Sequence, residues 1–122
     1  MTDTADVNLV LGCILEDDAL EKRAGEHVAQ VGRLLVPFSA GIELLMVAVR
    51  YQLGCVRTIG AASTHFDVEN RGVLETAAEA LDAKEVPTVF DAIHLADALH
   101  RGSKLHTADK RLHRTPFPTV AF

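Results

Sequence analysis

The sequence has 122 residues, of which 48% are apolar and 24% charged, and its formal net charge is −5 at pH 7. These values fit a single globular domain over residues 1–122, and the negative charge argues against a protein that coats nucleic acid by general electrostatic attraction. No apolar run is long enough to span a membrane, and the acidic N-terminus lacks the basic region of a signal peptide, so we expect a cytoplasmic protein.

Short apolar runs and amphipathic patterns alternate along the chain. The first run, 7–15, fits a buried strand, or a strand that turns into a short helix. The remaining pattern predicts, in order, helix 19–31, strand 34–36, helix 40–53, weak helix 57–65, strand or turn 66–69, helix 70–83 and edge strand 117–122. In the helix over 40–53, Ser39 is the expected N-cap, Glu43 lies in the first turn and Gly54 is the expected C-cap. This alternation favours an α/β fold, with a parallel sheet covered by helices on both faces.

The stretch 88–112 carries the clearest local signals. Thr88 is a plausible N-cap with Asp91 as the acidic partner of a capping box, and Gly102 stands where a helix C-cap is expected. Residues 103–106 then fit a strand, which leaves Thr107 and Asp109 just past its end. Asp91 is explained either as a helix cap alone or as part of a site, because sites in open α/β sheets gather at the carboxyl ends of strands.

Four acids share one feature: each lies at an element junction beside an apolar segment. They are Asp6, Glu43, Asp91 and Asp109. In a parallel sheet such junctions can converge at one edge, where carboxylates repel one another unless cations neutralise them. Oxygen-rich sites of this kind select Mg²⁺ or Mn²⁺, and such a metal can activate water and brace a phosphate.

Positive charge is concentrated near the C-terminus. Residues 101–114 contain five Lys or Arg residues against the single acid Asp109, a local charge of +4 that leaves −9 for the rest of the chain. Two interpretations stand side by side: a solvated basic surface, or a rim that contacts phosphates beside the acidic site.

These residues resemble the PIN-domain nuclease family, and most closely the VapC-like toxin ribonucleases of toxin–antitoxin pairs. The resemblance covers about residues 5–122 and is strongest over 88–112. The matching motifs are Asp-x-Asn at 6–8, the lone Glu43 early in a helix, Phe-Asp-Ala-Ile-His-Leu-Ala at 90–96, and Leu-His-Thr-Ala-Asp at 105–109.

The resemblance implies a three-layer fold with a four- or five-stranded parallel sheet flanked by helices. It also implies Mg²⁺- or Mn²⁺-dependent hydrolysis of RNA phosphodiester bonds, an antitoxin partner protein and a homodimer. On the matching positions, the metal-binding and catalytic residues are Asp6, Glu43, Asp91 and Asp109, with Asn8 and Thr107 in supporting roles.

The N-terminal residues depart from the family's pattern. The family's first strand is central and apolar, whereas residues 1–5 read Met-Thr-Asp-Thr-Ala. Pattern alone puts the first strand at 7–15, which would leave Asp6 at the wrong end of it. The departure keeps open a second function, a non-catalytic PIN-like binding or scaffold module with a degenerate acidic site. Less favoured are a phospho-acceptor receiver domain and a metal site formed by Asp91, His94 and Asp97.

Overall fold

The computed structural model describes residues 2–16 and 19–122. Over these residues the chain forms α-helices, short strands and one 3₁₀ helix. In chain order they are α1 (Val7–Ile14), α2 (Glu21–Val31), β1 (Leu35–Val36), α3 (Phe38–Arg50), α4 (Cys55–His65), β2 (Asp67–Val68), α5 (Arg71–Asp82), α6 (Val89–His100), β3 (Leu105–Thr107), η1 (Leu112–Arg114) and β4 (Thr119–Ala121). No helix within 2–16 or 19–122 combines the length and apolar character needed to cross a membrane.

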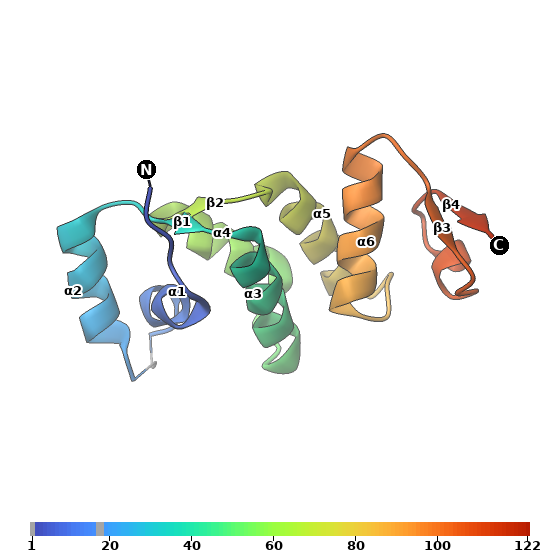
Figure 1. Cartoon of the computed structure of the whole chain (residues 1–122). Helices are drawn as coiled ribbons and strands as arrows, with labels where there is room; N and C mark the ends of the chain where they lie inside the picture. Colours follow the sequence, from blue (N-terminus) through green and yellow to red (C-terminus); the bar gives the residue numbers. More distant parts are fainter. Residues whose placement is uncertain (1, 17–18) are drawn as a thin grey trace.

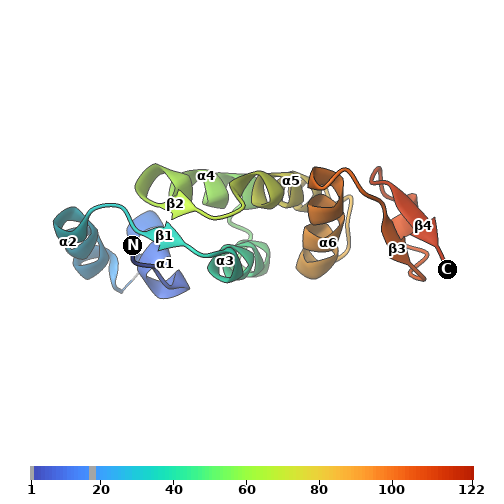
Figure 2. The ribbon, with the colours of Figure 1, turned by 45° about the horizontal axis from the view of Figure 1, so that its top comes forward.

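The elements are laid out along one direction, from α1 and α2 at one end to β3 and β4 at the other (Figure 1). Helices cover both sides of the β1–β2 pair, with α4 on one side and α1 and α3 on the other (Figure 2). Helix α6 packs on α5 and α3, and β3 follows it through the turn at Gly102, whose φ of +68° is readily adopted by glycine. The predicted α/β class, with parallel strands and flanking helices, is confirmed.

The strands are divided between two sheets rather than joined in one. β1 pairs in parallel with β2, and β3 pairs in parallel with β4. The N-terminal segment adds an isolated parallel bridge, Thr4 to Leu35, on the other side of β1. Residues 2–4 of this segment are polar, unlike those of a buried central strand. The segment pairs with β1 through this one bridge, and among the described residues no strand joins the two sheets.

The run after Asp6 is a helix, and the prediction of a strand over 7–15 was wrong. Asp6 has extended backbone (φ −85°, ψ 171°), and its Oδ1 accepts a hydrogen bond from the Leu9 N–H at 3.0 Å, which caps α1. Just before it, the Ala5 N–H donates to the Leu35 carbonyl at 2.8 Å. Asp6 therefore follows the strand-like segment, as the family resemblance requires. Periodicity alone cannot separate a short buried strand from a short apolar helix.

Two predicted caps of α3 were also wrong. The helix begins at Phe38 after an extended Pro37, so Ser39 lies inside it and Glu43 lies in its second turn. Gly54, with φ +83°, is the N-cap of α4 rather than the end of α3. Pro37 fixes φ at the entry to the helix, and the Phe38 N–H donates to Glu69 Oε1 at 3.0 Å, so α3 begins two residues earlier than predicted. By contrast, Thr88 is the N-cap of α6, as predicted.

One close contact fixes α1 against α2. A Cβ added at Gly12 would lie 2.7 Å from the Cβ of Ala24, which has no rotamer by which to move away. We expect Gly12→Ala to lower the free energy of unfolding by about 1–3 kcal/mol. Gly25 on α2 has no atom within 4 Å of its added Cβ, so Gly25→Ala should instead stabilise by about 0.5–1 kcal/mol. Urea denaturation of both variants checks this, and equal stabilities would contradict the close packing of α1 on α2.

Candidate active site

Asp6 and Glu43 form an N-terminal pair. Both line an open cavity of about 850 Å³ between the N-terminal segment, α1 and α3, and Asn8 lines the same cavity. Both carboxylates are exposed, and among the described residues neither takes part in an ion pair. One of the Asp6 oxygens is used in capping α1. The structure therefore brings these two acids and Asn8 to one open cavity.

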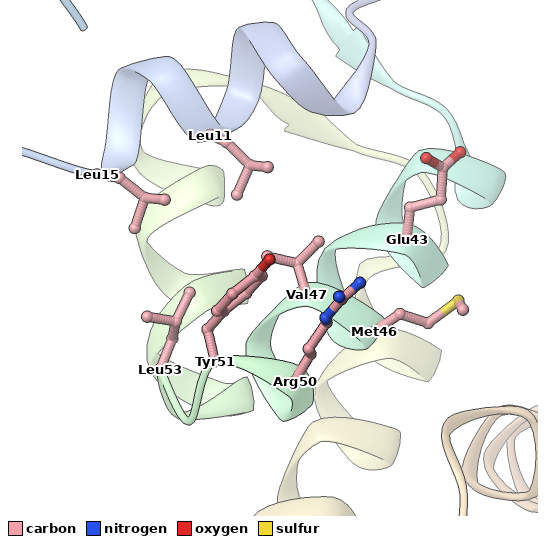
Figure 3. A pocket seen from close by; sticks show the side chains of 8 residues that line it. All are labelled: Leu11, Leu15, Glu43, Met46, Val47, Arg50, Tyr51 and Leu53. Atoms are coloured by element: carbon pink, nitrogen blue, oxygen red, sulfur yellow. The ribbon is translucent and has the colours of Figure 1, made fainter. Parts of the chain in front are cut away.

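A second open space meets the first at Glu43. It is a groove of about 900 Å³ with largely apolar walls between α1 and α3, lined at its far end by Leu15 and Leu53. Figure 3 shows Glu43 at one end of this groove, away from Leu15 and Leu53. Arg50 and Tyr51 lie between the two ends. Glu43 thus stands at the junction of an apolar groove and the more polar cavity that contains Asp6.

Asp91 is oriented by the start of α6. Its backbone N–H donates to the Thr88 Oγ1 at 3.1 Å, and the Thr88 hydroxyl in turn donates to Asp91 Oδ2 at 2.8 Å. The carboxylate is half-buried and lies in the first turn, where the helix dipole favours a negative charge. Asp91 is therefore both part of a helix cap, as the local pattern predicts, and an acid held in one orientation.

Asp109 lies in the turn after β3 and is bound by Arg111. Its Oδ1 accepts from the Arg111 backbone N–H at 2.9 Å and from Nε at 3.1 Å, and its Oδ2 accepts from Nη2 at 2.7 Å. Thr107 Oγ1 accepts the Asp109 N–H at 3.0 Å and so fixes the turn. The Arg111 side chain lowers the pKa of Asp109, helped by the Arg111 backbone N–H. Because the folded pKa is depressed, this contribution to stability is present above the unfolded pKa and is lost as pH falls through the folded value.

Asp91 and Asp109 form a second, C-terminal pair around Arg111. Asp109 is the main cause of the raised pKa of Arg111, and the charge of Asp91 adds to it, so the guanidinium senses both acids. The two pairs do not join. Across residues 2–16 and 19–122, no three His, Cys, Asp or Glu side chains lie close enough together to hold a metal ion. The acids are divided in the same way as the strands. Asp6 follows the N-terminal segment that pairs with β1, whereas Asp109 follows β3.

The four carboxylates are suitable ligands for a hard divalent cation, although they lie in two separate pairs. All four side chains are carboxylates and none is fully buried, so each keeps oxygen lone pairs accessible from water. Cysteine plays no part, because the two free thiols lie elsewhere in the fold. A metal at either pair would need water or phosphate oxygens for its remaining positions.

Sequence reasoning missed the pairing of Arg111 with Asp109. It placed Arg111 only in the basic stretch 101–114, as a surface cation or a phosphate contact. The i, i+2 spacing of Asp and Arg in a turn was the available signal, because a carboxylate two residues before an amide commonly accepts its N–H. Most other charges of this stretch are exposed, whereas His113 is fixed by contacts to Thr119 Oγ1 and the Thr107 carbonyl at 2.7 and 3.0 Å.

Parallel strands and flanking helices define an α/β protein, with acids at the junctions of its elements. The model of the PIN domain family matches residues 5–118, nearly the whole chain, so the chain belongs to the PIN domain family. The predicted family resemblance is thereby confirmed. PIN domains are generally metal-dependent nucleases, which places the protein with the hydrolases at this coarse level. Comparisons with curated proteins and with solved structures found no match.

The Thr88 hydroxyl is expected to stabilise α6 and to orient Asp91. We expect Thr88→Ala to lower the free energy of unfolding by about 1 kcal/mol, because the Asp91 N–H loses its acceptor. Thr88→Ser keeps the hydroxyl and should retain most of the stability. Chemical denaturation measures both, and a Thr88→Ala protein as stable as the wild type would show that the cap is energetically unimportant.

Proposed function

We propose that this PIN-domain protein is a Mg²⁺- or Mn²⁺-dependent endoribonuclease, and that it is the toxin of a type II toxin–antitoxin pair. The observation that carries the proposal is the placement of the four acids. Asp6 ends the N-terminal strand segment, Asp109 lies just past β3, and both other acids occupy the first two turns of helices. These four acids belong to the sequence motifs that resemble those of the PIN-domain nucleases.

Each acid has a role that its surroundings support. Asp6, Glu43, Asp91 and Asp109 are proposed to hold the metal and to be the catalytic residues. Asn8 shares the cavity of Asp6 and Glu43 and can orient a carboxylate or a water molecule. Thr107 holds the turn of Asp109 through its Oγ1 and thereby fixes the direction of that carboxylate.

A bound divalent cation would supply an activated water and charge stabilisation at the scissile phosphate. The chain's own contribution is to orient the carboxylates. Thr88 donates to Asp91, and the helix dipole of α6 favours its negative charge. The neighbouring cations Lys104, Lys110 and Arg114 are exposed and can contact the phosphates that flank the cleaved bond.

The partners follow from the same proposal. RNA is the substrate, a cognate antitoxin protein is the expected inhibitor, and the functional unit is expected to be a homodimer of single-domain subunits in the cytoplasm. The basic stretch at 101–114 supports a polyanionic substrate despite the negative net charge, because positive charge is concentrated on one segment. Coexpression with the protein encoded by the adjacent reading frame tests the antitoxin.

RNA cleavage with Mn²⁺ or Mg²⁺ tests the central proposal. We expect Asp91→Asn to lower the rate about 100-fold or more, because loss of a metal-holding charge removes several kcal/mol of transition-state stabilisation. Asp97→Asn is the matched control, since it removes the same charge from α6 at a residue that pairs with Arg101 on the surface. Equal cleavage by wild type and Asp91→Asn would refute the assignment.

One observation favours the non-catalytic alternative: no set of three potential metal ligands is assembled among the described residues. Thermal melting with Mn²⁺ separates the two functions. A working site should stabilise the fold by about 2.7 kcal/mol at a metal concentration 100 times the Kd, and Asp91→Asn should reduce this effect. A melting temperature that Mn²⁺ leaves unchanged in the wild type would favour a binding or scaffold module.

A further inference from the structure

Among the ion pairs of the described residues, only the one between Asp109 and Arg111 involves a candidate metal ligand. The pair is bidentate, with Nε on one carboxylate oxygen and Nη2 on the other. This fork leaves few free lone pairs on Asp109. A cation of the protein itself therefore occupies the carboxylate face that a metal would need.

The two partners differ in how firmly they are held. The Asp109 backbone is fixed on both sides, because its N–H donates to Thr107 Oγ1 and its carbonyl accepts from the N–H of the buried Leu112 at 3.1 Å. The Arg111 side chain is 61% exposed, against 30% for Asp109. The guanidinium can leave its partner by rotating into water without disturbing the core, whereas the carboxylate stays in place.

Arg111 is the counter-ion of Asp109. Asp109 is the main cause of the raised pKa of Arg111, and the charge of Asp91 adds to the shift. Other ion pairs, such as Arg71 with Glu75 and Arg101 with Asp97, join surface residues one helical turn apart and involve none of the four acids.

We propose that Arg111 competes with the divalent cation for Asp109, and that the guanidinium, once released, binds a phosphate oxygen of the RNA. The proposal rests on the proposed ribonuclease function. A guanidinium matches carboxylate and phosphate equally well, because both present two oxygens to its planar fork. Arg111 is then a positioning residue that keeps Asp109 ordered before metal binds and moves to the substrate afterwards.

The first test measures the Mn²⁺ dissociation constant of the metal-free protein by calorimetry, without RNA. Arg111→Gln should bind Mn²⁺ about two- to fivefold more tightly, the upper range of an exposed ion pair, because the competitor is gone. Arg111→Lys, a point charge without the fork, should fall between wild type and Arg111→Gln. Arg71→Gln removes the same charge by breaking an exposed ion pair with Glu75 outside the candidate site, and it should leave the Mn²⁺ dissociation constant at the wild-type value.

The second test measures binding of a single-stranded RNA oligonucleotide in Ca²⁺, followed against salt concentration. Arg111→Gln should bind the RNA more weakly than wild type does. Its slope of log affinity against log salt concentration should be less steep by about 0.7, the effect of one phosphate contact. Unchanged or weaker Mn²⁺ binding by Arg111→Gln overturns the proposal, as does the absence of Mn²⁺ binding in both proteins. If Arg111→Gln binds Mn²⁺ more tightly than wild type, but the wild type cleaves no RNA, then only the ribonuclease function is refuted.

Discussion

The pairing of the N-terminal segment with β1 determines where the first acid stands. The Ala5 N–H donates to the Leu35 carbonyl at 2.8 Å, and the Leu35 N–H donates to the Asp3 carbonyl at 2.9 Å. These two bonds hold the segment extended until Asp6, whose side chain then starts α1. The segment makes a single bridge, and among the described residues no strand pairs with its other edge. The remaining strands form two separate parallel pairs, β1 with β2 and β3 with β4.

A longer and more apolar first strand would offer two edges, one for β1 and one for β3. Here β3 pairs only with β4, beyond α6, and the acids are grouped accordingly. Asp6 and Glu43 share a cavity on the β1 side, while Asp91 and Asp109 share Arg111 on the β3 side. The acids are thus divided in the same way as the strands.

The sequence predicted the second half of the chain better than the first. The helix over 89–100 has a polar N-cap, an even apolar face and a glycine at its end, and all these local signals agree with its packing. The run 7–14 has no such agreement. Its apolar character is equally suited to a strand, and it forms a helix that Asp6 caps and that packs on α2. The cap of α3 was missed because Pro37 sets the backbone without a side-chain hydrogen bond.

The candidate site was predictable as a list of residues and less so as a geometry. Spacing identified the acids, but it could not reveal how their mutual repulsion is relieved in the folded chain. The structure gives two solutions. Asp6 and Glu43 face water in an open cavity, so solvent screens them. Asp109 is half-buried, and the Arg111 guanidinium binds both of its carboxylate oxygens. The fold thus supplies this acid with a cation of its own from two residues away.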